Sequence, residues 1–199
     1  MYFGWDYQGF VVQEDSIQTI EHHLFHALTK ACLIESRETS QYHRCGRTDK
    51  GVSAFGQVIS LSLRSKHPVE KQDLPESITT EMQYSKILNR LLPKDIRVVA
   101  WMPIPKELPE YSARFDCIKR TYKFYFPFVP RLRRHAPCVR ALIVTISAIF
   151  VKWTSQHLCT PLVIEGNAFL WHQIRCIMGV LLLVGRKGGV LTLLGTAGC

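Results

Sequence analysis

The 199-residue sequence contains no apolar run long enough to cross a membrane. The longest apolar run, residues 141–151, is far shorter than the roughly 20 residues that a membrane-spanning helix needs. The first residues also lack the basic and apolar segments of a secretory signal. We therefore expect a soluble, intracellular protein with no membrane partner.

Cysteine is present, but never in an arrangement that indicates a zinc site. The chain has seven cysteines, an odd number, and no Cys-x-x-Cys pair. His135 and Cys138 form an isolated pair, without a second pair at zinc-finger spacing. We expect reduced thiols and no metal. The glycine-rich tail after Gly185 lacks the full pattern of a phosphate-binding P-loop, so that class of nucleotide site is excluded.

Acidic residues are scarce in the last third of the chain. Residues 131–199 carry eight basic groups and one acid, Glu165, whereas residues 1–130 carry 17 basic and 15 acidic groups. The net charge of +9 favours a polyanionic partner, nucleic acid first and an acidic membrane surface second. Because two thirds of the chain is nearly neutral, charge alone is weak evidence for nucleic acid.

Helical spacing of apolar residues predicts a first helix that begins after Asp15 or Ser16, either of which can cap it. Its expected buried stripe is Ile17, Ile20, Leu24, Leu28 and Ala31. Its histidines, His22, His23 and His26, are interpreted as solvated residues and not as ligands. A second, short helix begins near Tyr84 and is stopped by Pro93.

Two apolar stretches in the first half predict strands. Residues 58–63 alternate and place Ile59, Leu61 and Leu63 on one face. Residues 96–101 favour another strand. The prolines at 103, 105 and 109 then indicate a linker. We therefore divide the chain into an N-terminal half, residues 1–105, and a C-terminal half, residues 106–199.

The strand at 58–63 follows a compact loop at residues 46–54. The loop places Arg47 and Asp49 between Gly46 and Gly51. Glycine allows the backbone to approach a ligand closely, and loops on rigid strands often carry functional residues. The alternative is an ordinary surface turn with a local ion pair. The loop pattern by itself leaves both readings open.

The C-terminal half contains an aromatic strand at 120–128 and a helix at about 171–185. The aromatics of one strand face could build a core or a surface on which bases stack, and core packing is the better interpretation from the pattern alone. Arg175 lies on the helix, where an exposed residue is the ordinary interpretation. Between residues 131 and 161 the sequence loses its pattern.

Three stretches together resemble the TruA family of tRNA pseudouridine synthases. They are residues 43–58, His-Arg-Cys-Gly-Arg-Thr-Asp-Lys-Gly-Val-Ser-Ala-Phe-Gly-Gln-Val; residues 111–122, Tyr-Ser-Ala-Arg-Phe-Asp-Cys-Ile-Lys-Arg-Thr-Tyr; and residues 169–179, Phe-Leu-Trp-His-Gln-Ile-Arg-Cys-Ile-Met-Gly. Residues 7–10 and 19–21 fit as well. The flanks of the first two stretches resemble the eukaryotic branch that modifies tRNA positions 38 and 39. The resemblance covers residues 2–130 well and 162–185 fairly.

The resemblance implies a catalytic role for four residues. Asp49 matches the nucleophilic aspartate, Arg47 the arginine that holds the target nucleotide out of its stack, and Tyr122 the tyrosine over the flipped base. Arg175 matches an arginine that keeps the aspartate ionised. The expected RNA-binding residues are Tyr122, Arg44, Lys50, Arg114, Lys119 and Arg120. Covalent catalysis by a carboxylate requires no metal or other cofactor.

The resemblance also implies a mixed α+β fold, with antiparallel sheets, helices on one face, and two halves around a central cleft. The expected partner is tRNA, bound across a homodimer in the nucleus or cytoplasm. Chemistry on a base requires extrusion of that base and an aromatic surface, which agrees with the residues at the loop and strand.

The sequence departs from the family between the aromatic strand and the last motif. About thirty residues fill a stretch that is usually long, and no His-Asp-Phe segment is present. Much of the first strand is also absent, and the chain ends soon after the last motif. We therefore regard the chain as a shortened version of a longer enzyme. Three hypotheses follow: an active tRNA pseudouridine synthase, a catalytically inactive RNA-binding fragment, and a product that does not fold stably.

Overall fold

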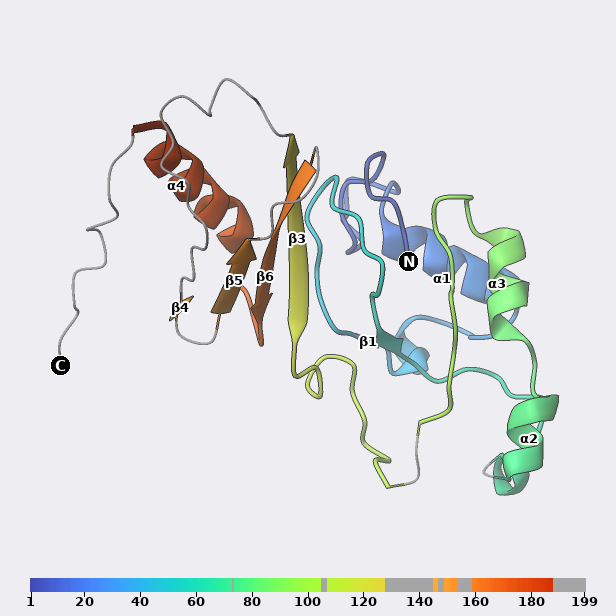
Figure 1. The fold of residues 1–199 in the computed structure, drawn as a ribbon. Coiled ribbons are helices and arrows are strands. Elements are labelled where there is room, and N and C mark those ends of the chain that lie inside the picture. The colour runs from blue at the N-terminus through green and yellow to red at the C-terminus, as the bar shows by residue number, and fades with distance from the viewer. Residues whose placement is uncertain (73, 105–106, 128–144, 147–148, 154–158, 188–199) are drawn as a thin grey trace. The chain divides into compact units, whose positions relative to one another are not determined.

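The computed structural model describes residues 1–72, 74–104, 107–127, 145–146, 149–153 and 159–187 (Figure 1). The described elements are helices and antiparallel strands, as expected for a mixed α+β protein. Two compact units, Met1–Cys117 and Ile118–Cys199, divide the chain. This division falls after the proline-rich linker at 103–109. Residues 111–116 belong to the first unit because Ala113 donates to Ser60 Oγ and Ser112 Oγ contacts His43 Nδ1.

The first unit is built on helices that surround one apolar core. Its elements are α1 (Ile20–Lys30), η1 (Glu38–Ser40), β1 (His43–Arg44), β2 (Ile59–Ser60), η2 (Val69–Lys71), α2 (Pro75–Thr80) and α3 (Tyr84–Leu91). Strands β1 and β2 pair antiparallel. The core includes Leu24 and Leu28 of α1, Tyr84 and Leu88 of α3, and Tyr2 of the N-terminal segment.

Helix α1 begins later than predicted. Thr19 caps it and accepts a hydrogen bond from the His22 backbone, so the prediction of Asp15 or Ser16 as the cap was wrong. The reason is that Ser16 N–H closes a turn onto Gln13, which keeps this segment outside the helix. Ile17 is consequently 70% exposed, although the spacing predicted burial. The later stripe positions Ile20, Leu24 and Leu28 are buried, with Ala31 packed beside them, as predicted.

Of the two strands predicted in the first half, one forms a short ladder and the other does not form. Around β2, Ile59, Leu61 and Leu63 pack on the core as predicted, although ladder pairing is confined to Ile59–Ser60. The predicted strand at 96–101 was wrong, because only an isolated bridge joins Ile96 to Tyr2. The Asn89 side chain of α3 binds both the N–H and the C=O of Val98, which occupies the groups that a neighbouring strand would need.

The second unit is a four-stranded antiparallel sheet with one described helix. Its strands are β3 (Arg120–Pro127), β4 (Thr145–Ile146), β5 (Ile149–Trp153) and β6 (Cys159–Gly166), in the order β3-β6-β5-β4, and the helix is α4 (Gln173–Lys187). Leu162, Ile164 and Met178 form its core, with Tyr122 and Phe124 packed against them. The core interpretation of these two aromatics is thereby confirmed.

Part of the stretch that lacks a sequence pattern is nevertheless ordered into strands. Strands β4, β5 and the start of β6 fall between residues 131 and 161, and β5 pairs with β6 over Phe150–Trp153. The rest of the apolar run at 141–151 and the basic run at 131–134 lie outside the described residues. The predicted helix near 171–185 corresponds to α4, whose Ile174, Ile177, Met178 and Leu181 form its apolar face.

Candidate active site

The loop that carries Asp49 is closed at its base by two hydrogen bonds. Cys45 N–H donates to Val58 C=O at 3.0 Å, and Gln57 Nε2 donates to Gly46 C=O at 2.7 Å. Inside the loop, Val52 N–H donates to Asp49 C=O at 3.1 Å. Gly51 has a φ of 78°, a left-handed conformation that glycine adopts without steric cost. The loop therefore has a defined turn immediately after Asp49.

The loop exposes its two basic residues. The side chains of Arg47 and Lys50 are exposed, whereas Asp49 between them is half-buried. A carboxylate flanked by two accessible cations suits a site for a polyanion, because the cations attract the ligand. This arrangement favours the functional interpretation of the loop over an ordinary surface turn.

The N-terminal segment, residues 2–10, holds the backbone of the loop. Phe10 N–H donates to Thr48 C=O at 3.1 Å, and Gly51 N–H donates to Tyr7 C=O at 3.2 Å. The Tyr2 hydroxyl lies 2.7 Å from Thr48 Oγ1. Hydrogen bonds from the segment therefore reach the loop on both sides of Asp49. Such restraint is what a catalytic group needs, because its geometry must be fixed before the reaction.

Two glycines allow the segment and the loop to lie this close together. A Cβ at Gly4 would overlap the backbone carbonyl of Val52, and a Cβ at Gly9 would stand 3.0 Å from the carbonyl oxygen of Thr48. Gly9 also has a φ of 120°, which other residues rarely adopt. Nothing in the sequence pattern indicates the packing requirement at Gly4.

Arg44, expected to bind RNA, takes part in a buried ion network. The carboxylate of Glu21 is fully buried in α1 and accepts from Arg44 Nη1 at 2.7 Å, Arg37 Nη2 at 3.0 Å, the Tyr42 hydroxyl at 2.9 Å and Val12 N–H at 3.1 Å. Burial, reinforced by the Glu21 charge, raises the pKa of Tyr42. The network connects α1 to β1, the strand that leads into the loop. Its role in RNA binding stays a prediction.

Arg114 is the remaining predicted RNA-binding residue of the first unit. It is exposed, and its guanidinium lies 5.0 Å from the ring centroid of Phe115, which is also exposed. The Phe115 ring in turn contacts the imidazole of His43 edge-on, with centroids 6.1 Å apart. An exposed arginine stacked on an exposed aromatic ring is a surface that nucleotides can contact.

The other predicted site residues lie in the second unit. Tyr122 is partly buried, and its ring meets Phe169 edge-on with centroids 5.1 Å apart. Arg175 is exposed in the first turn of α4. Lys119 pairs with Glu165 at 3.5 Å, and Arg120 donates to the Asn167 carbonyl. The structure thus gathers Asp49, Arg47 and Lys50 on one loop, and it places Tyr122 and Arg175 on the sheet and helix of the other unit.

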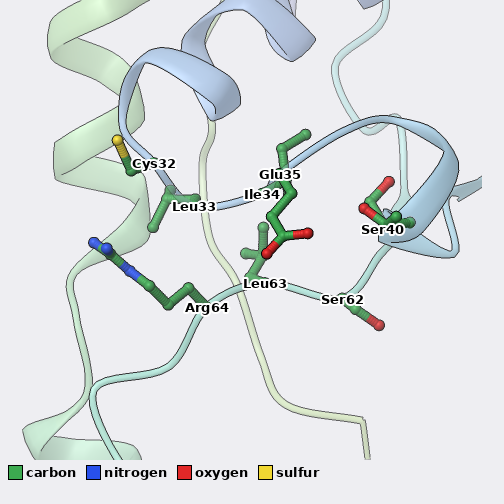
Figure 2. A pocket seen from close by; sticks show the side chains of 9 residues that line it. Cys32, Leu33, Ile34, Glu35, Ser40, Ser62, Leu63 and Arg64 are labelled. Atoms are coloured by element: carbon green, nitrogen blue, oxygen red, sulfur yellow. The ribbon is translucent and has the colours of Figure 1, made fainter.

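A pocket in the first unit contains none of the predicted site residues. Its volume is about 480 Å³. Figure 2 shows the side chains that line it. It is lined by Cys32, Leu33, Ile34, Glu35, Thr39, Ser40, Ser62, Leu63 and Arg64. The candidate site is therefore defined by the loop and not by this cavity. Among the described residues, no group of three His, Cys, Asp or Glu side chains could hold a metal ion, and no helix is long and apolar enough to span a membrane.

Comparisons with known proteins show what the chain is similar to. A family model described as tRNA pseudouridine synthase matches residues 128–191. The chain is 41% identical over 224 positions to tRNA pseudouridine(38/39) synthase of Mus musculus, 40% identical to that of Homo sapiens and 37% identical to that of Saccharomyces cerevisiae. Over almost its whole length, the chain is therefore similar to tRNA pseudouridine(38/39) synthases.

The alignments to these tRNA pseudouridine synthases cover 93% or 94% of the chain but only 46% or 47% of each relative. The chain therefore spans about half the length of the curated relatives that it matches. The alignment to the mouse protein runs over 224 positions, more than the 199 residues of the chain, so the relative contains residues within the aligned region that the chain lacks. This agrees with the expectation of an internally shortened sequence.

The family model matches where the sequence pattern is weakest. Residues 128–191 include the stretch at 131–161, for which the motifs gave no assignment. The motif around Arg175 lies within the matched region. Sequence reasoning missed Tyr2 and Glu21 as supports of the loop at residues 46–54, because each acts through a partner distant in the sequence.

Proposed function

We propose that this chain isomerises uridine to pseudouridine in the anticodon stem-loop of tRNA, at positions 38 and 39, with Asp49 as the nucleophile. The single observation that carries the proposal is the restrained loop, which holds a half-buried aspartate between exposed Arg47 and Lys50. The names of the aligned relatives supply the substrate and the positions. The similarity to these relatives supports the reaction class.

In the proposed reaction the Asp49 carboxylate attacks the ribose C1′ of the target uridine. The C1′–N1 bond breaks, and its electron pair leaves with the uracil. The uracil rotates and forms a new bond from its C5 to C1′, which releases the carboxylate. The C5 proton is lost to solvent and N1 gains a proton, so the product has the same atoms as the substrate. Arg47 holds the extruded nucleotide.

The roles of Tyr122 and Arg175 are proposed on the family resemblance alone. Tyr122 stacks on the extruded uracil, and Arg175 keeps the catalytic carboxylate ionised. We also infer from the resemblance a cleft between two halves, a homodimer and a nuclear or cytoplasmic location. Light scattering of the purified chain measures the dimer directly. Arg175→Ala is expected to lower the rate of isomerisation more than it weakens tRNA binding.

Tritium release tests the proposed reaction. Isomerisation exchanges the hydrogen at C5, so tRNA labelled with tritium at the uridine C5 should release label into water. Asp49→Asn should abolish release. Asp15→Asn is the control, because Asp15 is an exposed carboxylate outside the loop, and this variant should still release tritium. Absence of release by the folded wild-type chain would refute the proposal. Salt-sensitive tRNA binding without release would instead favour the inactive RNA-binding fragment.

The target positions are tested with altered substrates. Anticodon-arm RNAs that contain cytidine at position 38, at position 39 or at both are compared with the unaltered arm. We expect each single replacement to reduce release and the double replacement to abolish it. Undiminished release from the doubly replaced arm would show that another uridine is the target.

A further inference from the structure

Tyr2 contacts both ends of the segment that carries Asp49. Its hydroxyl lies 2.7 Å from Oγ1 of Thr48, the residue directly before Asp49. Its backbone N–H donates to Ala54 C=O at 2.8 Å, and its own C=O accepts from Ala54 N–H at 3.0 Å. A single residue therefore fixes the loop at positions 48 and 54, with Asp49 between them.

Tyr2 is itself held in place from several directions. It is 3% exposed, and its ring lies against Phe10 with centroids 5.6 Å apart. Besides Ala54, it bridges Ile96. The adjacent residues add two backbone bonds, from Arg97 N–H to Met1 C=O and from Phe3 N–H to Asp95 C=O. Tyr2 thus lies between two bridge partners, Ala54 on one side and Ile96 on the other, and provides a rigid support.

The hydroxyl acts on a part of the loop that the backbone bonds of Tyr2 do not reach. The two bonds to Ala54 fix the far end of the loop, whereas the hydroxyl fixes the residue adjacent to Asp49. Thr48 is β-branched and therefore has few rotamers, so a bond to its Oγ1 also restrains its backbone. Its C=O accepts a second bond from Phe10 N–H.

We propose that Tyr2 is a positioning residue for the isomerisation, which holds Thr48 so that Asp49 is presented in the orientation for attack. This inference rests on the proposed function, because the orientation matters only if Asp49 is the nucleophile. A small displacement of a reacting group costs one to two orders of magnitude in rate. Substrate binding depends on other residues and should not change.

The test uses Tyr2→Phe, which removes only the hydroxyl and keeps the buried ring. Tyr84→Phe is the matched control, because Tyr84 is 5% exposed and its hydroxyl donates to the Arg64 carbonyl, away from the loop. In tritium release, we expect Tyr2→Phe to lower kcat roughly tenfold with unchanged KM. Tyr84→Phe should leave both within about twofold. Thr48→Val should match Tyr2→Phe, and the double variant should lose no more than either single variant.

Hydrogen exchange provides a readout that does not require activity. The amides of Gly51, Val52 and Ala54 are hydrogen-bonded and report the order of the loop. They should exchange faster in Tyr2→Phe than in Tyr84→Phe if the hydroxyl orders the loop. Equal kcat and equal exchange in the two variants would overturn the inference. If the wild-type chain releases no tritium, the proposed function fails, and the exchange comparison alone decides whether Tyr2 orders the loop.

Discussion

Replacing Glu21 with glutamine should destabilise the first unit strongly. The change removes the negative charge from a fully buried site and leaves the guanidiniums of Arg37 and Arg44 beside each other without a counterion. Glutamine keeps one acceptor oxygen but places an NH₂ group against donors. One of the two arginine hydrogen bonds, at 2.7 and 3.0 Å, is therefore lost, and the other no longer joins opposite charges.

The expected loss is set by the burial of the partners. Removing one member of a buried ion pair costs about 3–5 kcal/mol, because the other charge remains buried and unpaired. The Arg44 side chain is only 17% exposed, so its unpaired charge accounts for most of the expected loss of stability. Arg37 is 35% exposed and is partly solvated, so it contributes less. Since small domains have about 5–15 kcal/mol of stability, the predicted loss is a large fraction of the total.

Urea unfolding followed by circular dichroism measures this loss. Glu14→Gln is the control, because it makes the same chemical change at an exposed position and should not move the midpoint. Arg44→Met should destabilise more than Arg37→Met, in line with their exposure. A loss below about 1 kcal/mol for Glu21→Gln would refute the reasoning, since it would mean that the carboxylate is not effectively buried.

Two further predictions concern the support of the loop and the response to high pH. Gly4→Ala should displace the loop from the N-terminal segment, because the added Cβ overlaps the Val52 carbonyl. The variant should therefore have both a lower rate of tritium release and a lower thermal stability. Unchanged values for both would contradict the close packing. Burial raises the pKa of Tyr84 to about 12. The folded protein therefore keeps a proton that the unfolded chain loses near pH 10, so stability should fall as pH rises from about 10 to 12. Tyr84→Phe should make this fall shallower, and identical pH profiles for the two proteins would count against the shift.

Features set by nearby residues could be predicted from the sequence. Helix α3 follows from apolar spacing that starts at Tyr84 and from the stop at Pro93. The apolar face of α4 and the alternation around Ile59 follow in the same way. The loop motif with Asp49 could be located because its residues are contiguous. These features depend on spacing within one segment.

Features set by distant contacts could not be predicted. Thr19, Ser16 and Asp15 are all good caps, and the choice of Thr19 depends on a turn between Gln13 and Ser16. The strand expected at residues 96–101 is prevented by a side chain from α3, Asn89. Similarly, nothing near Glu21 in the sequence indicates burial, because its partners follow many residues later. These partners become visible only in the folded chain.

The central claim, that Asp49 is the nucleophile of a tRNA uridine isomerase, is tested most directly by single-turnover tritium release with wild-type chain and Asp49→Asn. Both proteins are used in excess over C5-labelled tRNA, after tRNA binding and thermal unfolding have been measured for each. We predict release by the wild type and none by Asp49→Asn, while binding and the unfolding temperature stay close to the wild-type values. Release by Asp49→Asn at a rate near that of the wild type would contradict the account.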